Sequence, residues 1–173
     1  PIKSSAASDV YKRQIYSFSQ IEDKVKALHE TNTEAAAAVA LSWLGLSRDE
    51  LKTLRVSDYN STMRMLHSAG RVVYVREDLI ADMLKAICEE APEYSMGFFI
   101  TDVNSAYEAA EKQELSPISV LKMRYFYEKH SAKLSGEPED RVFLKEILRS
   151  VGESEADMEK QFAEYEKDAP EKI

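Results

Sequence analysis

Apolar positions between residues 19 and 54 recur at helical spacing, and a polar start signal precedes each run. Ile21, Val25 and Leu28 share one face of a first predicted helix over residues 19–30. An alanine-rich run then predicts a buried helix that Gly45 ends, and a short third helix covers residues 47–54. Each of the three starts has Ser or Thr three residues before Glu, which is the capping-box pattern. The predicted boxes pair Ser19 with Glu22, Thr31 with Glu34 and Ser47 with Glu50.

The hydrophobic period changes after residue 60. Residues 62–67 and 71–75 are rich in β-prone side chains, and Ser68, Ala69 and Gly70 join them, which predicts a hairpin with Gly70 at positive φ. Residues 78–90 return to helical spacing, and residues 97–101 are expected to form a third strand or a buried extended segment. Four further helices are predicted over residues 104–114, 117–134, 139–150 and 154–167, with Ser116 and Pro117 starting the second of them.

These elements predict one α+β domain over residues 15–173. The domain is mainly α-helical, and its helices pack on a small β-hairpin or three-stranded sheet, because a hairpin alone is only marginally stable. Residues 1–14 follow neither the helical nor the strand period. We expect them to be a disordered or non-native lead and give them no functional role.

Composition excludes several classes of protein. The 173 residues carry a formal net charge of −8, which argues against a generic nucleic-acid coat or a membrane-surface protein. No apolar run approaches the roughly 20 residues of a membrane span. Cys88 is the only cysteine, so an internal disulfide is excluded and a cytoplasmic location is expected. The three histidines are scattered without ligand spacing, and neither a metal site nor a cofactor is predicted.

General catalytic motifs are missing, but one stretch of the sequence is more specific. There is no glycine-rich phosphate loop, no G-x-S-x-G motif and no H-E-x-x-H motif. Residues 38–60, however, resemble the first signature of the tyrosine recombinases, the phage integrase family, and the hairpin and next helix follow in the family's order. The residues at matching spacing are Gly45, Leu46, Glu50, Leu51, Leu54 and Asp58.

The resemblance implies a recombinase-like catalytic-domain fold over roughly residues 15–167. In that family a tyrosine hydroxyl attacks a DNA phosphate, while arginines, a lysine and histidines stabilise the charge that develops in the transition state. Ser47 stands where the first arginine is expected, and we interpret Ser47 as a helix N-cap. Arg48 is adjacent, but one residue along a helix turns the side chain by about 100°. The family's hairpin lysine has no counterpart between residues 62 and 71.

The later signatures are also incomplete. Residues 121–127 resemble the family's H-x-x-R motif and its aromatic helix, with Arg124 kept and Leu121 in place of histidine. Glu153 replaces a second histidine, and Tyr165 fits the nucleophile only if the helix is one turn longer. The candidate catalytic residues are therefore Arg48, Arg124 and Tyr165, which are not a complete set. Because losing one preorganised donor costs about 2.7 to 4 kcal/mol in the transition state, we expect no useful strand cleavage.

Charge is distributed unevenly along the chain. Residues 48–76 carry net +3 and residues 121–149 net +2, whereas residues 77–120 carry net −8 and residues 150–173 net −5. The basic surplus therefore falls in the two stretches that resemble the DNA-facing parts of the family. The candidate phosphate contacts are Arg48, Lys52, Arg55, Arg64, Arg71, Lys122, Arg124, Lys129 and Lys133.

Three functional hypotheses remain open from the sequence. The leading one is a catalytically degenerate, integrase-like protein of a phage or another mobile element that binds double-stranded DNA as a regulator or repressor. The second is an active tyrosine recombinase with displaced catalytic residues. The third is a protein-interaction domain without DNA binding that uses its acidic C-terminal helix, through which a homo-oligomer would form.

Overall fold

The computed structural model describes residues 18–90, 97–130 and 141–168, apart from the side chains of residues 18–19, 141–143 and 165–168. The predicted lead over residues 1–14 lies outside the described residues. The mainly helical α+β architecture is confirmed. In chain order the elements are α2 (Phe18–Thr31), α3 (Thr33–Trp43), α4 (Arg48–Thr53), the 3-10 turn η1 (Val56–Asp58), β1 (Tyr59–Asn60), β2 (Met65–Ser68), β3 (Arg71–Tyr74), α5 (Asp78–Glu90), α6 (Val103–Lys112), α7 (Pro117–Lys129), α9 (Arg141–Val151) and α10 (Glu155–Asp168).

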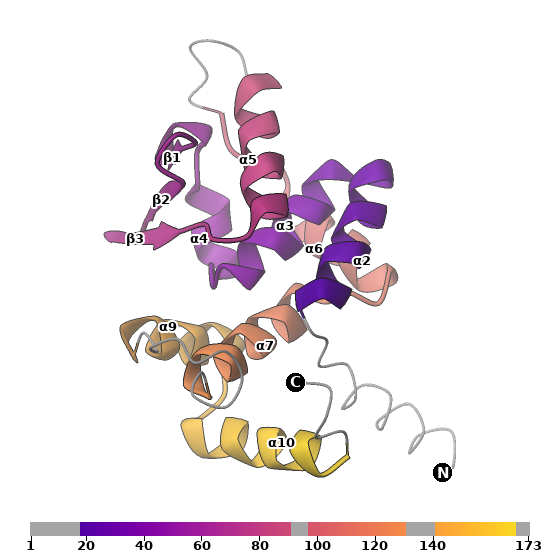
Figure 1. The fold of residues 1–173 in the computed structure, drawn as a ribbon, viewed down its shortest axis with the longest axis vertical. Helices are drawn as coiled ribbons and strands as arrows, with labels where there is room; N and C mark the ends of the chain where they lie inside the picture. Colours follow the sequence, from indigo (N-terminus) through magenta and orange to yellow (C-terminus); the bar gives the residue numbers. More distant parts are fainter. Residues whose placement is uncertain (1–17, 91–96, 131–140, 169–173) are drawn as a thin grey trace.

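Helix α3 lies at the centre of the fold. Every side chain from Ala35 to Trp43 is buried, and α2, α6 and α7 pack around the helix (Figure 1). The alanines have small side chains, which lets the neighbouring helices approach closely. Gly45 adopts a φ of 91° directly after the helix, and the Leu46 N–H donates to the Leu41 carbonyl at 3.1 Å. This is the glycine-dependent helix end that the sequence predicts.

The predicted helix starts are partly confirmed. Ser116 caps α7, and Ser47 caps α4. The prediction for Thr31 is wrong because Asn32 caps α3 instead, its Oδ1 accepting the Ala35 N–H at 2.9 Å. The carboxylate of Glu34, which should have completed the box, accepts hydrogen bonds from Thr101. The prediction for Ser19 is also wrong, since α2 is already helical at Phe18.

The sheet is antiparallel in the order β1-β2-β3 and lies beside α4 and α5 (Figure 1). Ala69 and Gly70 alone form the hairpin turn, both at positive φ, so β2 begins later and reaches further than predicted. Residues 97–101 do not form the expected third strand. Phe98 makes a single bridge to Arg55, while β1 supplies the third strand. Phe99 and Ile100 are buried, which agrees with the alternative of a buried extended segment.

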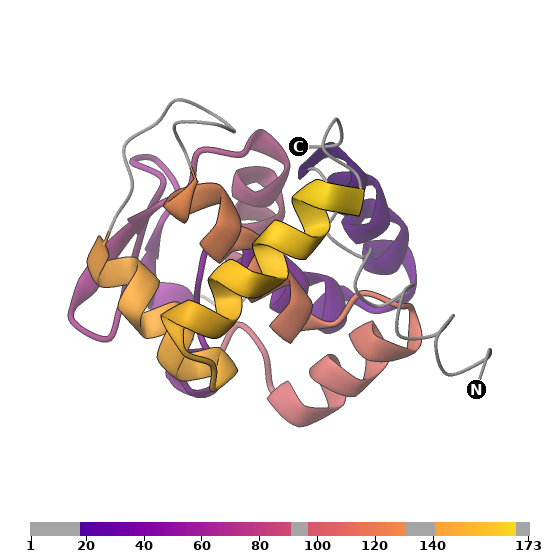
Figure 2. The same cartoon turned by 90° about the horizontal axis from the view of Figure 1, so that it is seen from below.

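Helices α7, α9 and α10 form the part of the molecule furthest from α5 (Figure 1). Figure 2 shows α10 crossing diagonally in front of α7. Met158 and Phe162 of α10 are buried, and the Phe162 ring lies 5.3 Å from that of Phe126 on α7. Helix α7 ends at Lys129, five residues before the predicted end.

Candidate functional site

Ser47 occupies the position that the resemblance assigns to the first catalytic arginine. Its side chain is buried, and its Oγ accepts the Glu50 N–H at 3.1 Å. The Glu50 carboxylate accepts the Ser47 N–H in return, also at 3.1 Å. The interpretation of Ser47 as a helix N-cap is therefore confirmed. This position supplies no positive charge for a phosphate.

A buried polar network joins the start of α4 to the hairpin. The Ser68 hydroxyl donates to Glu50 Oε2 at 2.7 Å, and Arg71 Nη2 lies 2.9 Å from Glu50 Oε1. Burial is the largest influence on Glu50 and would raise its pKa, but the hydrogen bonds from Ser68 and Ser47 and the charge of Arg71 together lower that pKa below its usual value. Arg71, a predicted phosphate contact, thus directs its guanidinium to an internal carboxylate.

The inward direction of Arg71 has a signal in the sequence that our prediction did not use. Leu66 and Val73 face each other across the strands and are both buried. Because side chains two residues apart lie on the same face of a strand, Ser68 and Arg71 share the inward face with them. The strand period therefore predicts an inward arginine that needs an acidic partner.

Arg48, a candidate for both catalysis and DNA binding, turns toward α6. Its side chain is exposed, and its Nε donates to Asn104 Oδ1 at 3.1 Å. The guanidinium also lies over the ring of Tyr107, 4.8 Å from the centroid. These contacts hold the Arg48 side chain along the surface of α6.

Arg124, the arginine kept from the second signature, is held between carboxylates. Its guanidinium lies 2.5 Å from Glu128 and 3.5 Å from Glu77, with only 15% of the side chain exposed. It also lies 5.6 Å from the Trp43 ring centroid, and the Trp43 Nε1–H donates to Glu77. Two adjacent carboxylates neutralise the charge that a phosphate would need, so this arrangement favours a structural role for Arg124.

The described residues do not assemble the predicted catalytic set. Arg48 contacts α6, whereas Arg124 contacts α3, α7 and the residue before α5. Tyr165 lies on α10, but its side chain is outside the described residues. The described part of the site therefore offers a capping serine and a neutralised arginine where the recombinase reaction needs two phosphate-binding cations.

The two predicted lysine contacts on α7 are paired with acidic residues near the chain's C-terminal end. Lys122 Nζ lies 2.8 Å from Glu153, and Lys129 Nζ lies 2.8 Å from Glu155. Gln161 of α10 also donates to Glu153. Both lysines are therefore already paired with acidic residues of the same chain. Lys133, the remaining candidate on this side, lies outside the described residues.

The remaining cations lie on α4 and next to the sheet. Lys52 is exposed on α4. The Arg55 guanidinium lies over the Phe98 ring, 4.6 Å from its centroid. Arg64 forms an exposed ion pair with Asp78 at 2.8 Å, and its hydrogen bond to Asp78 raises its pKa. Arg55 is half-buried and Arg64 already has a carboxylate partner, so Lys52 is the candidate of this group most accessible to an external anion.

A surface hollow of about 370 Å³ connects α4 to the tip of the hairpin. Thr53 and Asp58 line one side, and His67, Arg71 and Val72 line the other. The Asp58 carboxylate accepts the Arg55 N–H at 2.8 Å, so this side chain stabilises the local turn of the backbone. The hollow brings the end of α4 and the outer side of the hairpin into one continuous surface.

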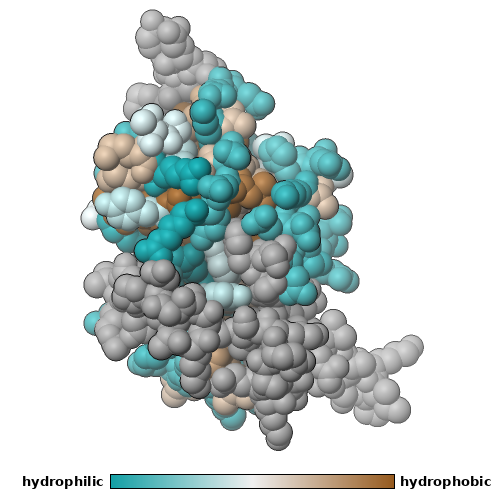
Figure 3. Space-filling model, viewed as in Figure 1, coloured by the Kyte–Doolittle hydropathy of each residue, from teal (hydrophilic) through white to brown (hydrophobic). Residues whose placement is uncertain are grey.

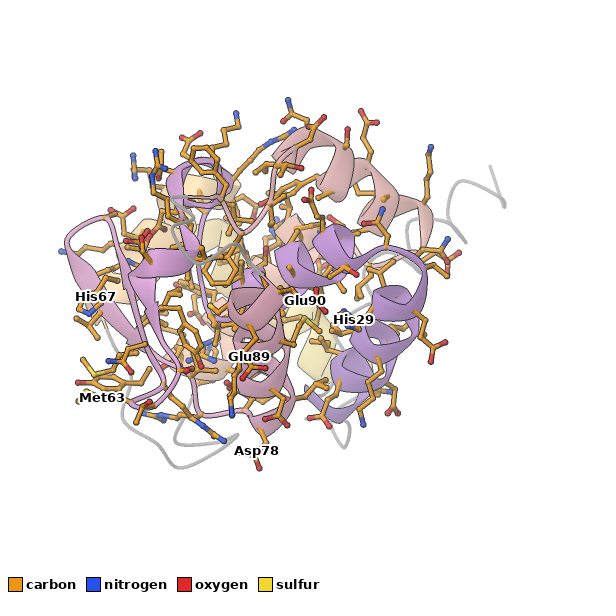
Figure 4. All side chains as sticks on the ribbon, turned by 90° about the horizontal axis from the view of Figure 1, so that it is seen from above. His29, Met63, His67, Asp78, Glu89 and Glu90 are labelled. Carbon is orange, nitrogen blue, oxygen red and sulfur yellow. The ribbon has the colours of Figure 1, made fainter. Side chains whose placement is uncertain are left out.

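The outer face of the sheet is apolar, and our sequence interpretation assigned it no function. Met63, Tyr74 and Val72 expose 62%, 60% and 42% of their surface. Figure 4 shows Met63 and His67 on the side of the sheet that faces away from the helices. Strict alternation in β3, with Val73 inward, was the signal that would have identified Val72 and Tyr74 as outward.

Other site types receive no support from the described residues. Within residues 18–90, 97–130 and 141–168, no group of three or more His, Cys, Asp or Glu side chains is placed to hold a metal ion. None of the helices described there has the length and apolar character to span a bilayer. Cys88 is half-buried, and burial raises the pKa of its thiol, so its nucleophilic thiolate form is disfavoured.

Comparison with known proteins adds no assignment. No protein-family model, curated protein or solved structure matches this chain. The candidate site therefore rests on the residues and contacts described above.

Proposed function

We propose that this chain is a DNA-binding domain of the tyrosine-recombinase type without strand-cleavage activity, acting as a regulator in a phage or another mobile element. The domain contacts double-stranded DNA through the α4–hairpin surface. We define this surface as the exposed side chains of residues 48–76 together with the hollow between α4 and β3.

The charge of the α4–hairpin surface is the observation that carries this proposal. Residues 48–76 contain six Lys and Arg against three Asp and Glu. The buried Glu50 pairs with Arg71, which leaves five Lys and Arg against Asp49 and Asp58. One of the five, Arg64, pairs with Asp78 just beyond this stretch. The surplus at the surface is therefore no larger than the sequence count, but it stays positive. Localised positive charge is what attracts a phosphate backbone.

Two observations support the absence of strand cleavage. Ser47 uses its side chain to cap α4, and Arg124 is neutralised by Glu77 and Glu128. Transition-state stabilisation at a phosphate requires preorganised cations that are not already paired. The alternative, an active recombinase with displaced catalytic residues, would need Arg48 to leave α6 and Arg124 to leave its two carboxylates when DNA binds.

Duplex affinity of charge variants tests the DNA-binding surface. In the variant Lys52→Gln/Arg55→Gln we expect affinity for a fluorescent duplex to fall about tenfold or more near physiological salt, because two phosphate contacts are lost. The matched control is Lys26→Gln/Lys112→Gln, which removes the same charge from exposed positions on α2 and α6. Thermal melting of both variants establishes that they are folded. Equal weakening in the two variants, or no binding by the unmodified protein, contradicts the proposal.

A nicked suicide duplex separates this proposal from the active-recombinase alternative. Such a substrate traps a tyrosine-linked protein–DNA adduct, because the short fragment released by cleavage diffuses away and the strand cannot be rejoined. We expect no covalent adduct on denaturing gels. An adduct that Tyr165→Phe abolishes would establish strand cleavage and refute the degenerate assignment.

A further inference from the structure

Strand β3 lies at the edge of the sheet, and its outer backbone edge is open. The sheet has the order β1-β2-β3, and within the part of the chain that the structure describes no strand pairs with the far side of β3. The Val75 N–H donates to the Arg64 carbonyl, on the β2 side, at 2.9 Å. Backbone groups of an antiparallel strand point alternately to its two sides, so those of Val72 and Tyr74 point away from β2.

The side chains along this edge are exposed as well. Val72 and Tyr74 expose 42% and 60% of their surface, and Met63, just before β2, exposes 62%. Figure 3 shows tan and pale surface over the sheet. Natural edge strands are commonly protected by lysine, proline, a bulge or a covering element. Strand β3 reads RVVY, without lysine or proline, and its register with β2 is regular, so it is able to accept a further strand.

The cations beside this edge already have partners in the same chain. Arg64 pairs with Asp78 at 2.8 Å, and Arg71 pairs with Glu50 at 2.9 Å. Arg76, which follows β3, also has an interaction within the chain. A polyanion therefore gains little at the β3 edge, whereas a second copy of the same edge meets no block of uncompensated like charge.

The edge of β3 is complementary to itself. When two copies of β3 pair antiparallel about a two-fold axis at Val73, Val72 of each copy stands opposite Tyr74 of the other. Aromatic and β-branched side chains are favourable cross-strand neighbours. In this register the outward backbone groups of Val72 and Tyr74 meet, so each of these pairs exchanges two hydrogen bonds. Arg71 stands opposite Val75 of the second copy, and like charges do not face each other directly.

We propose that β3 is a dimerisation strand, which pairs antiparallel with β3 of a second copy and joins the two sheets into one. The interface is isologous, because the same strand contributes from both copies. It is also small, so we expect association in the micromolar range and not an obligate dimer. This contact differs from the acidic C-terminal helix that the sequence suggests as a surface for homo-oligomers, and it does not depend on DNA binding.

Sedimentation of the full chain over a concentration series measures the association. We expect the unmodified protein to shift from monomer to dimer as its concentration rises. In Val72→Lys/Tyr74→Lys we expect the dissociation constant to rise about tenfold or more, because like charges then stand opposite each other across the pair. The two added positive charges reduce the net charge of −8, so general repulsion between chains falls and weaker association has a local cause.

The matched control for the lysine variant is Val72→Ile/Tyr74→Phe. It keeps apolar, β-prone side chains at both positions, and we expect it to dimerise like the unmodified protein. Thermal melting of both variants establishes that they are folded.

Disulfide formation between copies tests the register. In a Cys88→Ser background, a Val72→Cys chain is mixed with a Tyr74→Cys chain and oxidised mildly. We expect this mixture to form a covalent dimer faster than either chain alone. Directly opposite Cα atoms lie about 5.5 Å apart, within reach of a disulfide, whereas diagonal positions lie about 7–8 Å apart, beyond that reach.

Three results would overturn the proposal, and all are obtained without DNA. A protein that stays monomeric up to about 0.5 mM leaves this edge without a second copy as its occupant. Association that is equally strong in the lysine variant places the contact elsewhere, for example on α10. Equal crosslinking of the mixture and of the single chains contradicts the pairing of Val72 with Tyr74.

Discussion

At the scale of single residues, the position of a charge decides what it can do. Arg71 and Arg124 looked like phosphate contacts in the sequence, yet each directs its guanidinium to carboxylates inside the protein. Charge counts do not reveal such pairs, because the acidic partner of Arg71 is 21 residues away along the chain. Ser47, in contrast, was correctly interpreted as a cap because its partner Glu50 is local. For Arg124 one partner, Glu128, lies four residues away on the same helix, and this local signal was not used in our prediction.

Replacing Glu50 by Gln tests the buried network. We expect Glu50→Gln to lower the free energy of unfolding by about 2 kcal/mol at pH 7, because a charged hydrogen-bond acceptor for Ser68 and Arg71 is lost. The measurement is urea unfolding followed by circular dichroism. A change below about 0.5 kcal/mol would contradict the stabilising role of this network.

The same variant has a defined pH dependence. The pKa of Glu50 is lower in the folded protein than its usual value, so its ionised form stabilises the fold above about pH 4.3, the ordinary pKa of glutamate. This contribution is lost as the pH falls through the folded-state pKa. We therefore expect the stability difference between Glu50→Gln and the unmodified protein to shrink below about pH 4. A difference that grows with acid would reverse the assigned direction.

At the scale of elements, local signals predicted most helices and the β2–β3 hairpin but not the third strand of the sheet. Gly45, Ser47 and Ser116 end or begin helices as predicted, because their hydrogen bonds involve neighbours in the chain. The capping box predicted at Thr31 does not form, because the Glu34 carboxylate accepts a hydrogen bond from Thr101, 67 residues away. The strand expected over residues 97–101 failed for a related reason, since Phe98 bridges only Arg55 and the next two side chains enter the core. Long-range contacts overrode the local pattern in both places.

The hairpin turn offers a stabilising substitution. Ala69 and Gly70 adopt φ values of 49° and 75°, the arrangement of a two-residue turn that favours Asn-Gly. Because alanine is strained in this region and asparagine tolerates it, we expect Ala69→Asn to raise the free energy of unfolding by about 0.5 to 1 kcal/mol. Thermal or urea unfolding measures the gain. A loss of stability would show that the turn differs from the one described.

At the scale of the whole molecule, the basic residues of α7 and those of the α4–hairpin surface have different surroundings. The acidic groups at Glu153 and Glu155 pair with the lysines of α7, so this basic stretch is occupied within the chain. On the α4–hairpin surface Lys52 and Arg76 are exposed, whereas Arg64 pairs with Asp78 and Arg71 with Glu50. The net charge of −8 is therefore compatible with a local site for DNA. Sequence segments predicted two basic regions, but only the tertiary structure shows which of their cations are already paired with acidic residues of the same chain.

The salt dependence of duplex binding tests the central claim most directly. Each phosphate contact contributes a slope of about −0.9 to a plot of log affinity against log salt concentration. Between about 50 and 200 mM salt, we expect the slope of Lys52→Gln/Arg55→Gln to be smaller in magnitude by about 2 than that of the unmodified protein. The Lys26→Gln/Lys112→Gln control should keep the original slope. A slope near zero for the unmodified protein, or an unchanged slope in the first variant, would contradict DNA binding through the α4–hairpin surface.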